Sequence, residues 1–459
     1  MAFKKTPFFS LGGNMQYFGT DGIRGIAGKE LTCELVLKTS RALSHICKEL
    51  GQSKILLAKD TRSSGDMLEA AACAGILSEG LDAHKLSTVS TPAAAYLTRF
   101  LNADACIMLT ASHNQSYYNG IKMFDSAGKK FSEEIERRIE KIMDLDIPYG
   151  TDVGKIVHLD EAHLDYENFI ISICNSKLKN KKIVVDCANG ALYKIAPSIF
   201  KKLGANIIAI NAKNEGSLIN YECGSTYPSA IKKAVLKYKA DIGFAFDGDG
   251  DRILVCDNLG KLYGGDTLLY IFAKHLKSLG RLSDSTVVGT IMTNLGMELS
   301  LKKLGINLVR VDVGDKYILE NMLLNNYSLG GEESGHIVIR EKLITGDGLI
   351  SAITLLNIMA ENNLNLNELT KDLIVFPQVL INVIVPEIYK KKILIHTDVV
   401  KILDSSKKQL EGKGRIVFRA SGTEPKLRIM AEGENLQLIE SLAKDIEYCI
   451  VDTLQKLKS

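Results

Sequence analysis

The sequence contains no tryptophan and only 8 prolines in 459 residues, and none of its 9 cysteines forms a C-x-x-C pair. The cysteines are scattered and several lie in apolar runs, so we predict buried, reduced thiols rather than disulfides or a zinc site. The longest apolar stretches, such as 105–109 and 379–385, are far shorter than the roughly 18 residues that a membrane span requires. These absences argue against a disulfide-rich secreted protein and against a membrane protein.

An excess of charge of one sign is also lacking. Lysine and arginine total 57 and aspartate and glutamate total 54, which gives a formal net charge of +3. This balance disfavours bulk binding to nucleic acid or to a membrane, so any recognition of anions must be local. The N-terminal residues contain no apolar segment of the kind found in signal peptides, so we expect a cytoplasmic location.

The chain is too long for a single hydrophobic core, because cores stop growing near about 250–300 residues. In the first two thirds, short β-branched runs alternate with helix-period segments, which predicts α/β domains with mainly parallel sheets. The expected strands there are 54–59, 105–109, 182–185, 242–246, 287–291 and 308–311, and expected helices include 31–50 and 66–80, the latter capped from 63–65. The C-terminal part predicts a small α+β domain, with strands 378–385, 415–418 and 426–431 and a helix over 436–457. We expect domain limits of 1–155, 156–260, 261–374 and 375–459.

The segment F-D-G-D-G-D-R (246–252) is the strongest chemical signal. Asp247, Asp249 and Asp251 alternate with glycines, and three carboxylates so close together repel one another unless a cation neutralises them. An EF-hand is excluded because Arg252 stands where its loop requires glycine and Asn258 where it requires glutamate. Oxygen ligands of this kind favour one Mg²⁺ ion over a merely solvated acidic turn.

A second loop, T-A-S-H-N-Q (110–115), follows a buried strand, a position where α/β proteins often carry functional side chains. Ser112 is either a nucleophile or a stable carrier of phosphate, and its phosphate would supply the ligand that the metal still needs. The adjacent His113 raises the alternative of a Ser-His hydrolase. On an extended strand, however, neighbouring side chains point to opposite faces, and no G-x-S-x-G turn is present. Lys122 is a candidate proton shuttle or counter-charge for phosphate.

Two further loops suit a phosphorylated sugar. G-G-E-E-S-G-H (330–336) offers Glu332 and Ser334 to hydroxyl groups and His336 as an acid or base. R-A-S-G-T-E-P-K-L-R (419–428) concentrates donors suited to a phosphate, namely Arg419, Ser421, Thr423 and Arg428. Arg24 lies in a glycine-rich segment near the N-terminus.

Together, FGTDGIRG (18–25), TASHN (110–114) with NGIK (119–122), DGDGDR (247–252), GGEESGH (330–336) and RASGTEP (419–425) closely resemble the motifs of the α-D-phosphohexomutase family. VVDCANGA (184–191), the E-S-G-H form of the sugar loop and TGDG (345–348) are most similar to its amino-sugar branch, with the mannose and glucose branch as the rival. One departure is Gln115, where the family loop usually has proline, which removes a constraint on φ.

The resemblance implies four domains around a central cleft, three of related mixed α/β type and a last one of α+β (TBP-like) type that closes as a lid. It implies that Ser112 carries the phosphate and binds Mg²⁺ with Asp247, Asp249 and Asp251, and that Arg24, Lys122, Arg252 and His336 serve catalysis. It further implies a hexosamine phosphate substrate, gripped by Glu332 and Ser334 and clamped by Arg419, Ser421, Thr423 and Arg428, with a hexose 1,6-bisphosphate as activator. A Mg²⁺-dependent phosphatase and a non-catalytic sugar-phosphate sensor remain alternatives, as do a monomer and a homodimer.

Overall fold

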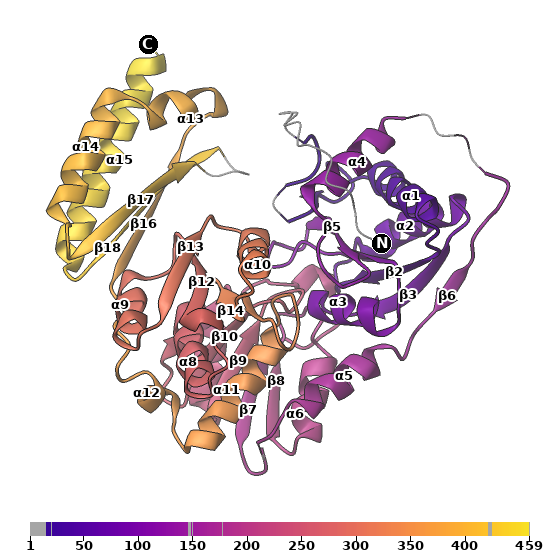
Figure 1. Cartoon of the computed structure of the whole chain (residues 1–459), viewed down its shortest axis with the longest axis horizontal. Helices are drawn as coiled ribbons and strands as arrows, with labels where there is room; N and C mark the ends of the chain where they lie inside the picture. The colour runs from indigo at the N-terminus through magenta and orange to yellow at the C-terminus, as the bar shows by residue number, and fades with distance from the viewer. Residues whose placement is uncertain are drawn as a thin grey trace.

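The computed structural model describes residues 15–19, 21–145, 148, 150–176, 178–420 and 425–458. Within these residues the chain forms three mixed α/β domains, followed by a C-terminal domain built on an antiparallel sheet (Figure 1). The N-terminal segment on which the absence of a signal peptide was predicted lies outside the described residues. No helix in the described part of the chain combines the length and the apolar character needed to cross a bilayer.

The first domain has a sheet of six described strands in the order β1-β5-β4-β2-β3-β6. The pairs β4–β2, β2–β3 and β3–β6 are parallel, whereas β1–β5 and β5–β4 are antiparallel. Its elements are β1 (Ile23–Ile26), α1 (Cys33–Glu49), β2 (Lys54–Lys59), α2 (Gly65–Ser78), β3 (Asp82–Thr88), α3 (Thr91–Phe100), β4 (Ala105–Leu109), β5 (Tyr118–Asp125), α4 (Glu133–Met143) and β6 (Ile156–His158).

The second domain has the strand order β11-β10-β9-β7-β8, and the third has the order β13-β12-β14-β15. The second contains α5 (His163–Ser172), β7 (Lys182–Asp186), α6 (Ile195–Lys202), β8 (Asn206–Ile210), α7 (Pro228–Tyr238), β9 (Ile242–Phe246), β10 (Ile253–Asp257) and β11 (Leu262–Tyr263). The third contains α8 (Gly265–Ser278), β12 (Thr286–Thr290), α9 (Leu295–Lys303), β13 (Asn307–Val311), α10 (Asp315–Leu324), β14 (Leu329–Gly331), β15 (Ile337–Ile339), α11 (Gly348–Asn362) and α12 (Leu366–Leu369). Short 3₁₀ turns occur at 216–218 and 283–285.

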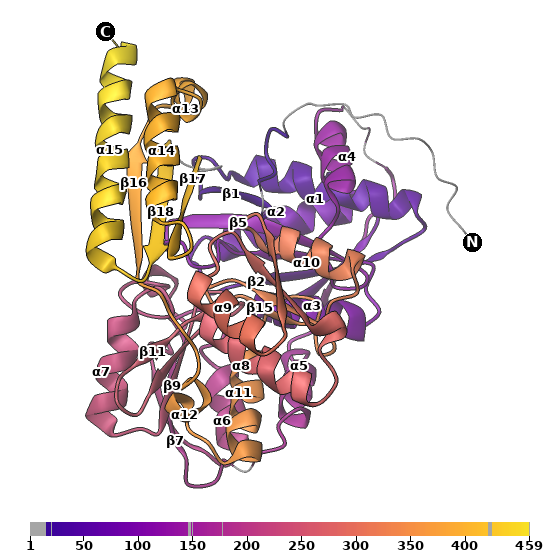
Figure 2. The same cartoon turned by 60° about the vertical axis from the view of Figure 1, so that its left-hand side comes forward.

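The fourth domain has an antiparallel sheet, β16-β18-β17, with helices packed against it (Figures 1 and 2). Its elements are β16 (Gln378–Ile384), α13 (Glu387–Leu394), α14 (Thr397–Gln409), β17 (Gly414–Ala420), β18 (Lys426–Gly433) and α15 (Leu436–Lys458). Along α15 the buried side chains recur every three or four residues, as expected for a helix with one apolar face on a sheet.

The prediction of mainly parallel sheets is wrong in one informative respect. Each of the four reactive loops joins two antiparallel neighbours: β4 to β5, β9 to β10, β14 to β15 and β17 to β18. Such a connection returns the chain beside the strand it has just left, so a short loop is held at both ends by the ladder. The functional motifs therefore lie on hairpin turns within mixed sheets.

Apolar packing separates the fourth domain from the others. One cluster of buried side chains runs through the first three domains, from Leu56 through Phe246 to Leu356. The fourth domain has its own cluster, built from β16, β18 and the inner faces of its helices, with Ile429 and Ile446 in it. The first three domains therefore share a core, and the fourth folds around another.

Two smaller predictions need correction. Six of the nine cysteines are buried, but Cys33, Cys174 and Cys449 are partly exposed, so burial does not apply to all nine. Ser64 occupies the N-cap position of α2, yet its side chain does not cap the helix. Instead, its Oγ accepts a hydrogen bond of 2.9 Å from Nδ2 of Asn119, which ties α2 to the serine loop's return strand.

Candidate active site

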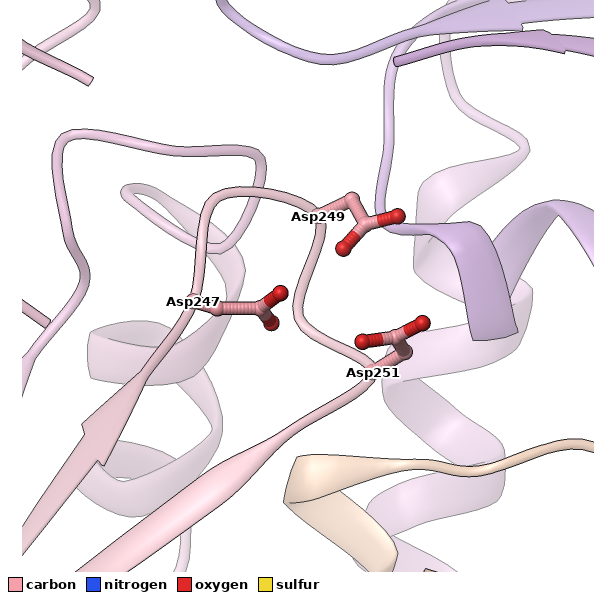
Figure 3. Close-up of side chains that lie close together, drawn as sticks. All are labelled: Asp247, Asp249 and Asp251. Atoms are coloured by element: carbon pink, nitrogen blue, oxygen red, sulfur yellow. The ribbon is translucent and has the colours of Figure 1, made fainter. Parts of the chain in front are cut away.

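The three aspartates of the turn between β9 and β10 point toward one another (Figure 3). Asp247 and Asp249 are fully buried and Asp251 is 4% exposed, so the turn is not a solvated acidic surface. One carboxylate oxygen from each residue lies within 4.8 Å of the others, the spacing of ligands around one cation. Glycine is needed at Gly250, whose φ of +76° is disfavoured for other residues.

Ser112 lies directly against this turn. Its Oγ donates a hydrogen bond of 2.7 Å to Oδ2 of Asp247, across 135 residues of sequence. The residue is 1% exposed and has φ of +51°, so it is not on an extended strand as the sequence argument assumed. The chain turns into the left-handed region immediately after β4, and this turn aims the hydroxyl at the carboxylates.

Lys122 balances the charge of the carboxylates. Its Nζ lies 2.9 Å from Oδ2 of Asp249, 3.4 Å from Oδ2 of Asp251 and 3.2 Å from Oδ2 of Asp21. Although burial opposes its charge, these carboxylates hold the pKa of Lys122 well above its usual range. An ammonium so firmly charged fits a counter-charge better than a proton shuttle. Arg24 joins the same group through an ion pair with Asp21.

The aspartates themselves differ. Burial, together with the charges of Asp251 and Asp249, raises the pKa of Asp247 well above its usual range. Burial also acts on Asp251, but Lys122 and His336 outweigh it and hold the pKa of Asp251 well below its usual range. Excess negative charge is thus concentrated at the position nearest Ser112.

The carboxylates fit a hard divalent cation by an independent criterion. Oδ1 of Asp249 and Oδ1 of Asp251 are buried and accept no hydrogen bond from the described residues. Their Oδ2 atoms are occupied by protein donors, such as the hydroxyl of Thr91, which donates to Asp249 at 2.6 Å. Buried carboxylate oxygens without a donor carry a large desolvation cost, which a cation coordinated by oxygen would offset.

His113 does not activate Ser112. Its Nδ1 accepts a hydrogen bond of 2.9 Å from Nη1 of Arg252. Burial and the neighbouring Arg252 lower the pKa of His113 to about 3, so the ring is neutral. The Ser-His hydrolase alternative therefore loses its base, since the ring orients Arg252 instead.

The sugar loop reaches the same centre through His336. Nδ1 of His336 lies 3.5 Å from Oδ2 of Asp251, and His336 forms a β-bridge with Arg252. Two residues earlier, Ser334 donates a hydrogen bond of 3.1 Å to Oε2 of Glu332, and Oε1 of Glu332 accepts from the backbone N–H of Gly314 at 3.1 Å. The structure therefore brings His336 to the metal ligands and leaves Glu332 and Ser334 together at the surface of the loop.

The predicted phosphate clamp is described in part. Ser421 and Thr423 lie outside the described residues. Arg419 and Arg428 are direct partners across β17 and β18. Burial and the charge of Arg428 lower the pKa of Arg419 below its usual value. Like charges placed opposite each other in a ladder repel, and a bound phosphate would relieve that repulsion.

The sequence analysis missed several residues that support the site. Asp21 and Lys130 form an ion pair beside Lys122, and Lys130 also pairs with Asp315 of α10, which joins the first and third domains. Asp21 stands inside the quoted motif FGTDGIRG, so its acidic side chain between two glycines was an available signal. Arg62 and Asn220, which hold the serine loop from behind, carried no recognisable pattern.

Sequence comparisons cover nearly the whole chain. Models of the phosphoglucomutase/phosphomannomutase family match residues 15–147 as α/β/α domain I, 162–260 as domain II, 264–375 as domain III and 380–447 as the C-terminal domain. The phosphoglucosamine mutase of Caldanaerobacter subterraneus is 44% identical over 434 residues, covering 94% of this chain and 97% of that protein. Phosphoglucosamine mutases of Clostridioides difficile and Clostridium botulinum (strain Eklund 17B) are 42% and 45% identical, over 96% and 95% of this chain and 99% of each relative.

Solved structures show the same fold. A phosphoglucomutase/phosphomannomutase family protein of Burkholderia thailandensis superposes with a TM-score of 0.78 at 23% identity, covering 94% of this chain and 96% of that one. An N-acetylglucosamine-phosphate mutase in its product complex superposes with a TM-score of 0.64 at 17% identity, over 94% and 96% of the two chains.

Proposed function

Because the chain belongs to the phosphoglucomutase/phosphomannomutase (α-D-phosphohexomutase) family, we propose that it acts as a phosphoglucosamine mutase through a phosphorylated serine. It is an isomerase of the intramolecular phosphotransferase type, and it interconverts glucosamine 6-phosphate and glucosamine 1-phosphate. In the cytoplasm this reaction would feed the synthesis of UDP-N-acetylglucosamine and of cell-wall precursors.

The contact between Ser112 and Asp247 carries the mechanism. A serine hydroxyl 2.7 Å from a buried carboxylate, and beside two more, is a poor place for a neutral hydroxyl alone. It suits a phosphoserine that shares a divalent cation with Asp247, Asp249 and Asp251. The near-full-length relatives at 42–45% identity support the choice of an amino-sugar phosphate as substrate.

In the proposed reaction, phosphorylated Ser112 gives its phosphoryl group to a free hydroxyl of glucosamine 6-phosphate. The bond from phosphorus to Oγ breaks, a bond to the sugar oxygen forms, and glucosamine 1,6-bisphosphate results. The bisphosphate turns within the site, and its other phosphoryl group returns to Ser112. Lys122, Arg24 and Arg252 hold charge around the transferred group, and Glu332 and Ser334 bind sugar hydroxyls.

Domain four supplies the second phosphate site. Arg419 and Arg428, with Ser421 and Thr423, would clamp whichever phosphate is not reacting. One Mg²⁺ ion per chain would neutralise charge on the transferred group. A hexose 1,6-bisphosphate would serve as activator by phosphorylating Ser112 in enzyme that has lost its phosphate. Either a monomer or a homodimer is compatible with a complete site in one chain.

Replacing Ser112 with alanine tests the phosphoenzyme. We expect Ser112→Ala to lower kcat by at least about 10⁴-fold, since removal of a nucleophile removes the reaction path. Ser116→Ala, in the same loop, is the matched control and should keep most of the activity. Full mutase activity of Ser112→Ala in a coupled assay would rule out the proposed mechanism.

A second assay separates the alternatives. Glucosamine, mannose and glucose 6-phosphates are compared for production of the 1-phosphate, and free phosphate is measured in parallel. We expect the highest kcat/KM with glucosamine 6-phosphate. Preference for mannose or glucose phosphate would favour the other branch of the family, and stoichiometric phosphate release without isomerisation would favour a Mg²⁺-dependent phosphatase.

A further inference from the structure

Arg62 lies behind the serine loop and is 2% exposed. Its Nη2 donates to the carbonyl oxygens of Ser112 and Asn114, both at 2.9 Å. Its Nη1 donates to the carbonyl oxygens of Gln115 and Tyr118, at 2.5 Å and 2.9 Å. One guanidinium group therefore collects four backbone carbonyls of the loop that carries the reactive serine.

The fifth N–H donor of Arg62 fixes the guanidinium itself. Nε donates to Oδ2 of Asp60 at 3.0 Å, and the side chains of this ion pair are fully buried. Thr110 donates to the same oxygen at 2.7 Å and accepts from the backbone N–H of Ser112 at 2.9 Å. The peptide groups on both sides of the Ser112 α-carbon are therefore held by one buried network. An arginine whose five donors are all used leaves little freedom to the groups it binds.

Asn220 of the second domain holds the same loop from the other side. Its Nδ2 donates to the carbonyls of Ser112 and Asn114, at 2.8 Å and 3.0 Å. Gly248 packs so closely here that a Cβ atom would lie 2.6 Å from the Ser112 carbonyl oxygen. This support matters because Ser112 has φ of +51°, a conformation that serine adopts only when its surroundings impose it. The same hold applies to Gln115, whose carbonyl is fixed although the family's usual proline is absent.

We propose that Arg62 is a positioning residue for phosphoryl transfer, which fixes the serine loop so that the phosphate on Ser112 faces Asp247, and that Asn220 is its counterpart in the second domain. Arg62 reaches only backbone carbonyls and Asp60, so it acts through the placement of Ser112. Placement is most of what phosphoryl transfer requires of a protein, and a shift of about 1 Å can cost about 100-fold in rate. The inference rests on the proposed phosphoserine mechanism.

The test compares Arg62→Lys and Asn220→Ala with a matched control, Asn357→Ala. Lysine keeps the charge but has no planar fork of donors, so it cannot serve four carbonyls and Asp60 at once. Asn357 is also an amide that binds backbone between two segments, accepting from Asn175 at 2.9 Å and donating to Ile173 at 2.9 Å, but it contacts no site residue. Loss of a structural amide without loss of placement is thus represented in the same protein.

Single-turnover transfer from the phosphorylated enzyme to glucosamine 6-phosphate is measured on protein shown to be folded by its melting curve. We expect transfer to fall about 100-fold in Arg62→Lys and about tenfold in Asn220→Ala, with KM within about threefold of wild type because the sugar and phosphate loops are untouched. Asn357→Ala should lower the melting temperature without slowing transfer.

Folded Arg62→Lys that transfers within about threefold of the wild-type rate would overturn the inference. If Arg62→Lys does not fold, Asn220→Ala decides, and either an unchanged rate or a loss equal to that of Asn357→Ala counts against positioning. Full activity of Ser112→Ala would instead overturn the proposed function. Inactive Ser112→Ala beside fully active Arg62→Lys and Asn220→Ala would leave that function standing and remove only the inference.

Discussion

The body formed by the first three domains and the fourth domain differ in how they hold their functional groups. In the body, Ser112, the aspartates and Lys122 are buried, and their contacts cross domain boundaries within a shared core. The fourth domain has its own core and meets the body through polar contacts, such as Arg415 to the carbonyl of Thr293 at 2.6 Å and Glu432 to the N–H of Leu295 at 3.2 Å.

The two regions also differ in charge. Around Ser112, acidic and basic side chains largely compensate one another, whereas Arg419 and Arg428 face each other as like charges. Charge compensation within a buried centre preorganises it before substrate arrives, while an uncompensated cationic pair gains most when a phosphate binds. The comparison assigns transfer to the body and retention of the second phosphate to domain four.

The largest effect should come from the metal ligands. Asp249→Asn keeps an oxygen for the donors Thr91 and Lys122 but removes the charge, and we expect kcat to fall about 10³-fold with loss of Mg²⁺ binding by calorimetry. Asp257→Asn is the control, since Asp257 is buried on β10 but bonds to the hydroxyl of Tyr263, at 2.9 Å. Unchanged kcat in Asp249→Asn would place the reacting centre elsewhere.

An intermediate effect, of a different kind, is expected in domain four. Arg419→Ala removes one cation of the clamp, so KM for glucosamine 6-phosphate should rise about 10–100-fold while kcat changes little, as for the loss of a charged hydrogen bond. Lys408→Ala, in the last turn of α14, is the control in the same domain. A fall in kcat as large as that of Asp249→Asn would abolish the distinction between the two regions.

The smallest effect concerns the stability of the shared core. Burial raises the pKa of Asp347, at the start of α11, to about 6, although it accepts a hydrogen bond of 2.8 Å from Tyr166. The folded protein therefore holds this proton more tightly than the unfolded chain. That contribution to stability is fully present below about pH 4 and is lost as the pH rises through about 6.

Urea unfolding between pH 4 and pH 8 measures it. Asp347→Asn should flatten this part of the profile by on the order of 1–2 kcal/mol. In Tyr166→Phe, which removes the donor but keeps the carboxyl, the step should persist and move to higher pH. Equal pH profiles for wild type and Asp347→Asn would show that another group titrates there.

Local signals in the sequence predicted much of the fold. The strands over Ala105–Leu109 and Ile242–Phe246 lie at the predicted bounds, because short β-branched or apolar runs bounded by polar turns encode buried strands directly. Glycine spacing likewise predicted the gathering of Asp247, Asp249 and Asp251. The antiparallel partners of these strands were not predicted, since a run of buried residues does not reveal the direction of its neighbour.

The sequence by itself determined which residues carry the chemistry: the aspartate trio, the serine and the arginines of the last domain stand in short motifs with chemical meaning. Only the tertiary structure decided how they meet. Ser112 reaches Asp247 across 135 residues, and Arg62 reaches the Ser112 carbonyl across 50. Contacts of this kind depend on how separate sheets pack, and packing against distant partners leaves no periodic trace in the local sequence.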